Sequence, residues 1–110
     1  MPAFNGIFSP YWRDDARGLI IGIGINTAKG HLVRALLEAP CLRSKEVAEA
    51  MEKDSGHRIT RMSVDGGMSA SNFLLQTQAD FMDATIVRKK EMEITSMGAA
   101  IAAGLRVGVW

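Results

Sequence analysis

Apolar side chains recur at three- and four-residue steps from Asn26 to Gly56, with charged residues between them. This spacing predicts one long amphipathic helix with a solvated opposite face. Asn26 or Thr27 is expected to cap its start, and Gly56 is expected to end it. Pro40 falls inside the pattern. Because proline removes a main-chain hydrogen bond and clashes with the preceding turn, we predict a kink or break between Leu36 and Pro40.

Three shorter apolar runs predict strands. Leu19–Ile25 is rich in β-branched residues and is interrupted by glycines, which favours a buried strand. Ile59–Val64 is the second predicted strand, and Thr85–Val87 is the third. Strands that alternate with helices predict an α/β layer with some parallel pairing.

Two further helices are expected. The first lies between the second and third strands, ends near Asp83, and begins at a cap provided by Ser69 or Ser71. Thr95 is expected to cap the last helix, whose interior consists largely of alanine and glycine. Such small side chains, Gly98 among them, allow another backbone or a flat ligand to approach closely, and we expect helix-to-sheet packing there.

The stretch from Met62 to Leu75 joins the second strand to the second helix through Asp65, Gly66 and Gly67. Two adjacent glycines permit positive φ angles and leave bare main chain for a ligand. The helix that follows offers unpaired N–H groups and the positive end of its dipole, which suit a nucleotide. A tight turn without any ligand is the alternative explanation of the same residues.

The first 18 residues are irregular, with prolines, glycines and a charged run. We expect an extended surface loop over aromatic side chains that anchor it to the core; an aromatic binding platform is the alternative. Arg17 is expected to form a salt bridge with Asp14 or Asp15. The aromatic residues concerned are Phe4, Phe8, Tyr11 and Trp12.

The net charge and the cysteine and histidine content of the chain exclude or disfavour several classes of function. The net charge of +1 does not favour nucleic acid or an anionic membrane. Cys41 is the only cysteine, which excludes a disulfide framework and a thiolate metal site, and His31 and His57 lack metal-ligand spacing. We expect a buried, apolar role for Cys41 and surface or helix-start positions for the histidines.

No secretory signal or run long enough to span a bilayer is found, so we expect a cytoplasmic protein. Residues 88–91 are expected to form a charged loop.

Four motifs stand out along the chain: Pro2–Gly6, Pro10–Gly18, Val64–Gly67 and Glu93–Ala100. In their order and spacing they resemble the carboxyl-terminal domain of the FGGY family of carbohydrate kinases, and most closely its glycerol kinases. The P-Y-W…A-R-G element within Pro10–Gly18 is the most specific part. A further stretch, Gly22-Ile23 followed by residues 31–38, is similar to the family's second signature.

This resemblance implies an α/β fold that is part of an actin-like, ribonuclease-H-like ATPase domain, a mixed sheet with packed helices. It implies that residues 1–110 are part of the carboxyl-terminal domain, the nucleotide-binding half, and that the amino-terminal kinase domain is absent and both ends are cut. The implied reaction of the full-length enzyme, a possible homo-oligomer, is transfer of the γ-phosphoryl group of ATP, with Mg²⁺, to glycerol, giving glycerol 3-phosphate.

The resemblance also implies a set of nucleotide contacts. The second glycine of the family's D-G-G motif contacts the nucleotide, and this glycine corresponds to Gly67, preceded by Gly66. A family asparagine four residues later corresponds to Ser71, and Asn72 lies one position further on, about 100° around a helix. The candidate nucleotide-binding residues are therefore Gly66, Gly67, Ser71 and Asn72, with no catalytic residue and no metal ligand.

Because the family's catalytic aspartate and phosphate loop lie upstream of the matched segment, we predict that the isolated chain has no kinase activity. Two alternatives stay open: a non-catalytic nucleotide-binding or interaction module, such as a truncated product, and another FGGY sugar kinase.

Overall fold

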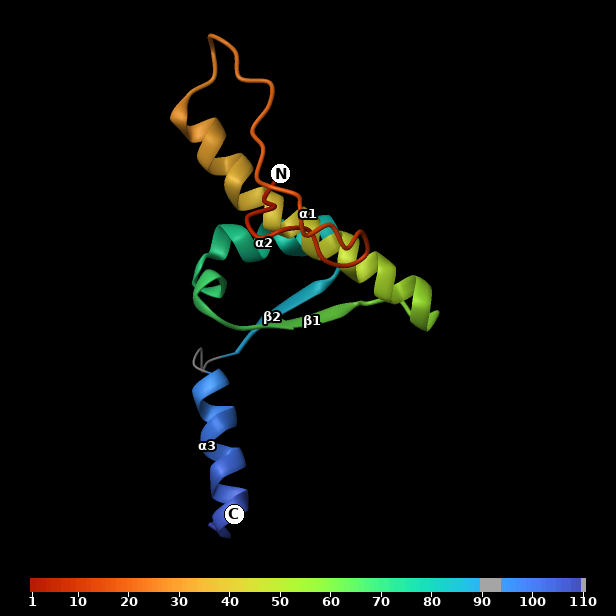
Figure 1. Cartoon of the computed structure of the whole chain (residues 1–110), viewed down its shortest axis with the longest axis vertical. Helices are drawn as coiled ribbons and strands as arrows, with labels where there is room; N and C mark the ends of the chain where they lie inside the picture. Colours follow the sequence, from red (N-terminus) through yellow and green to blue (C-terminus); the bar gives the residue numbers. More distant parts are fainter. Residues whose placement is uncertain (90–93, 110) are drawn as a thin grey trace.

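The computed structural model describes residues 1–89 and 94–109, and its helices and strands follow one another along the chain as Figure 1 shows. An irregular N-terminal segment precedes them. The elements are α1 (Lys29–Ser55), β1 (Arg61–Val64), the 3₁₀ helix η1 (Gly67–Ala70), α2 (Asn72–Met82), β2 (Thr85–Arg88) and α3 (Ile94–Val107).

The core lies where α1 crosses α2. Cys41 and Ala48 of α1 are buried there, as are Leu74 and Gln78 of α2. The Gln78 side-chain amide donates to the Cys41 carbonyl at 3.4 Å, and the Cys41 thiol lies 3.6 Å from the Leu74 carbonyl oxygen. Burial raises the pKa of the Cys41 thiol, because the charged thiolate would lose its hydration. The predicted role of Cys41 as a small buried group is confirmed.

The long helix α1 runs without interruption through Pro40, so the predicted break there is wrong. The proline penalty, about 3 kcal/mol, is local, whereas the α1–α2 contact lies on both sides of Pro40, with Arg34 over Phe73 before it and the buried Cys41 directly after it. The helix begins at Lys29, later than Asn26 or Thr27; the Thr27 hydroxyl oxygen accepts a hydrogen bond from the Gly24 N–H instead. Its predicted end is confirmed, with Gly56 in the left-handed region at φ 71°.

The two strands β1 and β2 pair in parallel, in a register that runs from Arg61 opposite Thr85 to Val64 opposite Arg88. Helix α2 makes the crossover between them. The predicted parallel pairing and these two strands are therefore confirmed. Because the pairing is parallel, the carboxyl ends of both strands lie at the same edge of the sheet, next to the first turn of α2.

The predicted strand Leu19–Ile25 is wrong: none of these residues forms a strand, and the segment runs as a loop between the N-terminal segment and α1 (Figure 1). Its large apolar side chains are exposed, with Ile21 at 86% and Ile25 at 101%. A strand needs a neighbour along its length to satisfy its N–H and C=O groups, and among the described residues this segment has main-chain hydrogen bonds to another segment only between Leu19 and Met1, at 2.8 and 3.0 Å.

The aromatic side chains of the N-terminal segment are exposed, which contradicts the predicted core anchoring of Phe4, Phe8, Tyr11 or Trp12. The segment is attached to α1 through Arg43 instead. The Arg43 guanidinium donates to the Ser9 carbonyl at 2.8 Å, and it lies over the Tyr11 ring at 5.6 Å from the centroid. The Arg43 contacts therefore take the place of the predicted aromatic anchor, and Ala3 is the buried apolar residue of the segment.

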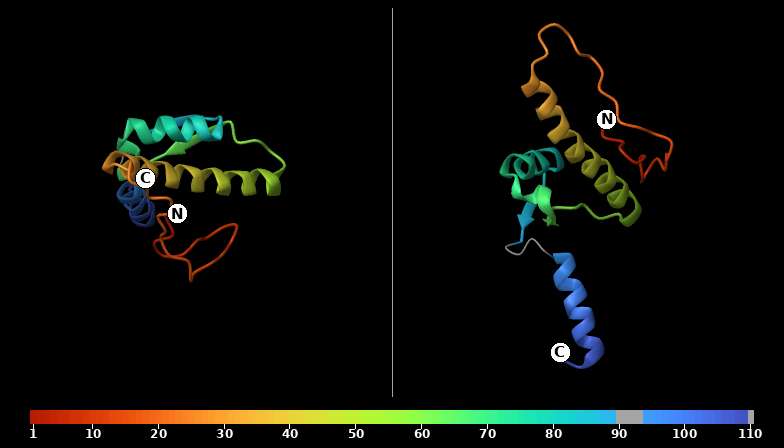
Figure 2. Two further views of the ribbon diagram at one scale, coloured as in Figure 1. Left: turned by 90° about the horizontal axis from the view of Figure 1, so that it is seen from above. Right: turned by 60° about the vertical axis from the view of Figure 1, so that its left-hand side comes forward.

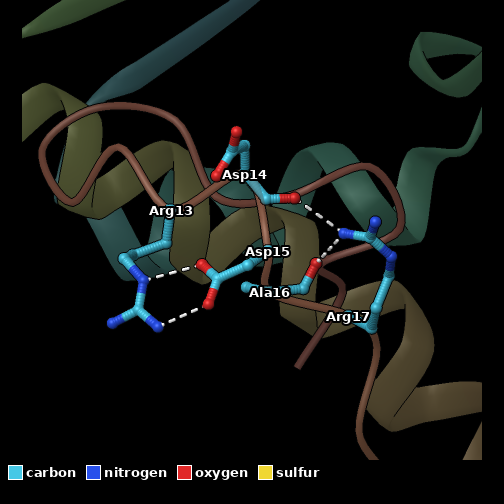
Figure 3. A network of polar contacts seen from close by, with 5 residues as sticks. All are labelled: Arg13, Asp14, Asp15, Ala16 and Arg17. Carbon is cyan, nitrogen blue, oxygen red and sulfur yellow. Dashed lines mark hydrogen bonds and ion pairs between the residues drawn. The ribbon is translucent and has the colours of Figure 1, made fainter.

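The predicted pairing of Arg17 with an aspartate side chain is also wrong (Figure 3). Arg17 Nη1 donates to the main-chain carbonyls of Asp14 and Ala16, at 2.7 and 2.8 Å. Arg13 takes the ion pair, with two 2.7 Å hydrogen bonds to the Asp15 carboxylate. The same contact lowers the pKa of the Asp15 carboxyl, chiefly through the hydrogen bond from Arg13.

Helix α3 extends away from the other elements (Figures 1 and 2). A side chain added at Gly98 would meet nothing within 4 Å, so the expected close packing is absent among the described residues. Thr95 lies inside the helix instead of capping it. Of the predicted charged loop, Arg88 belongs to β2, and Lys90 and Glu91 lie outside the described residues.

The shape as a whole is extended. The radius of gyration is 17.5 Å, whereas a compact domain of this size has about 13 Å. Within the described residues, no helix combines the length and apolar character that crossing a membrane requires.

Candidate nucleotide-binding corner

The chain turns sharply where β1 ends. Val64 is the last strand residue, and Gly66 then adopts φ 82° and ψ 173°, a backbone conformation that favours glycine. At both Gly66 and Gly67, an added Cβ atom would meet nothing within 4 Å. We define residues 65–72 as the corner, and its main chain therefore faces open space at Gly66 and Gly67.

Ser69 holds the turn from inside. Its N–H and its hydroxyl both donate to the Gly66 carbonyl oxygen, at 3.0 and 2.6 Å, and the residue is 3% exposed. The Ser71 N–H donates to the Met68 carbonyl at 3.2 Å and closes η1. The sequence suggested Ser69 as one possible cap of α2; the structure gives it the separate task of fixing the Gly66 peptide.

Ser71 is the N-cap of α2, which settles the choice between the two serines. Its hydroxyl oxygen accepts from the Leu74 N–H at 3.3 Å, and the hydroxyl hydrogen can still be donated to another group. Asn72 follows as the first helical residue, and its side-chain oxygen accepts from Arg88 at 3.1 Å. The four predicted residues thus lie in one short segment: two present bare main chain, one caps the helix and one is held by an arginine.

Sequence reasoning missed the part played by Arg88, which it assigned to a charged loop. The residue ends β2, and its guanidinium reaches across the sheet edge to the corner, where it contacts Ser69, Ala70 and Asn72. Parallel pairing could have indicated this, because it brings the residue that directly follows the third predicted strand next to the turn that follows the second.

Aromatic and charged groups flank the corner. Phe73, in the first turn of α2, lies under the Arg34 guanidinium, 5.7 Å from its ring centroid. Arg34 also pairs with Glu38 on α1 at 2.6 Å. No three His, Cys, Asp or Glu side chains gather into a metal-binding group anywhere in residues 1–89 and 94–109. The corner therefore presents open main chain at Gly66 and Gly67, with the Arg88 guanidinium beside it and the Arg34 guanidinium over Phe73 of the adjoining helix.

Comparison with known proteins defines the class to which this corner belongs. Residues 1–107 match the model of the FGGY family of carbohydrate kinases, C-terminal domain, so the chain belongs to that family. Among its relatives are glycerol kinase 2 of Streptomyces coelicolor and the glycerol kinase of Chloroflexus aggregans, each 54% identical over 110 residues. All of the chain is matched in both cases, but it spans only 22% of the length of either relative.

A solved structure agrees. The crystal structure of Plasmodium falciparum glycerol kinase with ADP is similar to this chain with a TM-score of 0.80 and 39% sequence identity, over 99% of this chain and 22% of the other. The predicted fold class, part of an actin-like ATPase domain, is confirmed by this likeness. The ADP is a ligand of that protein, and the four candidate contacts remain predictions for this chain.

Proposed function

We propose that this chain supplies part of the ATP site of an ATP-dependent glycerol kinase. That enzyme would transfer the γ-phosphoryl group of ATP to a terminal hydroxyl of glycerol, giving ADP and glycerol 3-phosphate. One observation carries the proposal: the bare main chain of Gly66 and Gly67 faces open space at the carboxyl edge of a parallel strand pair, where open α/β sheets bind their ligands. The similarity to glycerol kinases supports the choice of substrates.

The division of labour within the corner follows from its contacts. The Gly66 and Gly67 main chain would lie against the nucleotide, since no side chain of this segment occupies that space. Asn72 would provide a directed polar group, because Arg88 already holds its oxygen. Ser71 would add at most a hydroxyl donor, since its oxygen is committed to the Leu74 N–H.

Mg²⁺ belongs to the same proposal and would enter with the nucleotide. The described residues include no cluster of three metal-ligating side chains, whereas Mg²⁺ in phosphoryl-transfer sites is held largely by phosphate oxygens and water. The ion would neutralise charge on the transferred group. The attacking glycerol hydroxyl and its base would lie in the amino-terminal domain, which we propose as the partner of this segment, in a cytoplasmic enzyme that could form homo-oligomers.

The test uses the complete protein that contains this segment. Initial rates of ADP release are measured with ATP, Mg²⁺ and a panel of glycerol, xylulose and gluconate. We expect glycerol to be the preferred acceptor by kcat/KM. Preference for a sugar would support the alternative of another FGGY kinase, and nucleotide binding without turnover of any acceptor would support the alternative of a non-catalytic module.

A further inference from the structure

Within the described residues, the Arg88 side chain links β2 to the corner formed after β1 through polar contacts. Its Nη1 lies 3.0 Å from the Ser69 carbonyl oxygen, 3.3 Å from that of Ala70 and 3.1 Å from the Asn72 side-chain oxygen. One nitrogen therefore serves three acceptors, which requires shared hydrogen bonds of the kind common at helix ends.

These acceptors are the groups that need a donor. The last carbonyls of a helix have no partner within it, and the Ser69 and Ala70 carbonyls stand at the end of η1, just before α2 begins. A charged donor strengthens such bonds relative to a neutral one. Arg88 thus acts as a side-chain cap on η1 and at the same time fixes the orientation of the Asn72 amide.

The sheet register explains why the donor comes from β2. Arg88 lies opposite Val64, the residue directly before the corner, so its side chain starts at the same edge of the sheet. A donor on α2 itself would move with the segment that it is meant to fix. Arg88 ties the corner to a separate strand and so limits the positions that the Gly66–Gly67 main chain can adopt.

We propose that Arg88 is a positioning residue for the nucleotide, acting through η1 and Asn72 and not by touching the phosphates. This inference rests on the proposed function, because it takes the corner as a nucleotide site. The same geometry distinguishes arginine from lysine: a guanidinium presents several N–H groups in a fixed plane, whereas a lysine ammonium is a point donor on a flexible stem.

The experiment measures Kd values for ADP and for AMP by calorimetry on the complete protein. The variants are Arg88→Ala and Arg88→Lys, with Arg61→Ala as the matched control, since Arg61 lies at the opposite end of the same strand pair. We expect Arg88→Ala to weaken both nucleotides by the same factor, about tenfold, the effect of losing a charged hydrogen-bond donor. Arg88→Lys should fall between wild type and alanine, and Arg61→Ala should match wild type.

Two results overturn the proposal. Unchanged affinity in Arg88→Ala, with wild-type binding intact, removes Arg88 from the site while leaving the proposed function in place. A larger loss for ADP than for AMP would mean that Arg88 contacts phosphate directly. Failure of the wild-type protein to bind ADP at all is a different result, because it contradicts the proposed function itself.

A folding defect does not block the test. Should Arg88→Ala fail to fold, the folded variants Arg88→Lys and Arg88→Gln replace it: both should weaken ADP and AMP by the same factor, and unchanged affinity in Arg88→Gln would overturn the proposal. A double-mutant cycle with Asn72→Ala adds a second readout. If Arg88 acts partly through Asn72, the double variant should lose less affinity than the two single losses combined, and full additivity would count against that route.

Discussion

Strand β1 pairs in a sheet and the loop Leu19–Ile25 does not, and their amino-acid compositions do not explain this difference. The loop is the more apolar and β-branched of the two, yet it is exposed and forms no strand. Strand β1 carries Arg61 and Ser63, yet it pairs along its whole length. The difference is a partner strand: β2 returns beside β1 after one helix, whereas the loop shares main-chain hydrogen bonds with the N-terminal segment at Leu19 alone, within the described residues. Strand formation is therefore a property of pairs, and local propensity only permits it.

The loop also borders an unfilled hollow. A cavity of about 380 Å³ lies between it and the first half of α1, lined by Leu19–Ile21, Leu32 and Leu36, among others. Large apolar patches that remain exposed in a soluble protein mark surfaces that something else covers. Since the chain spans 22% of its relatives' length, we expect the rest of a complete kinase to cover this face.

The largest expected effect is on the kinase activity of the isolated chain. We expect the purified 110-residue chain to show no glycerol phosphorylation, because the base for the attacking hydroxyl is proposed to lie in the amino-terminal domain. A coupled assay for ADP release with ATP, Mg²⁺ and glycerol measures this. Any turnover above a protein-free blank would contradict both the proposed division of labour and the contrast drawn between the two regions.

The next effect tests whether the loop finds a partner in the complete protein. Ile23→Asp should lower the free energy of unfolding by about 2–4 kcal/mol, since a charge would be placed in a covered apolar surface. Denaturant titration of the complete protein gives the value. Met62→Asp in β1, at a half-buried position, serves as the reference. A change within about 0.5 kcal/mol for Ile23→Asp, beside a large one for Met62→Asp, would show that the loop stays exposed.

A third prediction concerns the corner at the end of β1. Gly67→Val should weaken ATP binding about tenfold or more in the complete protein, because the added side chain would fill space that the ligand needs. The φ angle of Gly67 is not positive, so backbone strain does not confuse the result. The KM for ATP and a direct Kd measure the effect, and Gly30→Val, another glycine with open space around it, is the control. Equal affinity in both variants would make the glycine turn purely structural.

The smallest effect separates capping from ligand binding. Ser71→Ala should cost about 1 kcal/mol of stability through loss of the N-cap, with a smaller change in ATP affinity than Asn72→Ala causes. Thermal unfolding and ATP titration of the two variants give both quantities. The reverse order, with Ser71→Ala the weaker binder, would assign the nucleotide contact to Ser71.

The sequence allowed the β1–α2–β2 unit to be predicted because each signal in it is local. The Ser71 cap, the glycine pair and the short runs of the two strands all act within a few residues. Leu19–Ile25 could not be predicted, because strand formation needs a partner strand, and local composition does not show whether one is present. The anchoring by Arg43 was also missed, since a hydrogen bond from a guanidinium to a carbonyl far away in the chain produces no periodic pattern in the sequence.

In the candidate site, too, one part could be predicted from the sequence and another could not. Glycine spacing pointed to the open main chain of Gly66 and Gly67, and the structure gives that open space. Arg88 escaped notice because a run of basic residues usually means an exposed loop, and only the register of β2 against β1 places it at the corner. Charge patterns along a chain do not reveal which cation reaches across a sheet edge.

The two hydrogen bonds from Ser69 to the Gly66 carbonyl oxygen determine the direction in which the Gly67 N–H points. A peptide unit is flat and trans, so its C=O and N–H vectors are antiparallel. With the Gly66 oxygen turned inward to meet both groups of Ser69, the Gly67 amide proton is directed outward. A single buried hydroxyl thereby aims a main-chain hydrogen toward the solvent side, where an incoming anion would arrive.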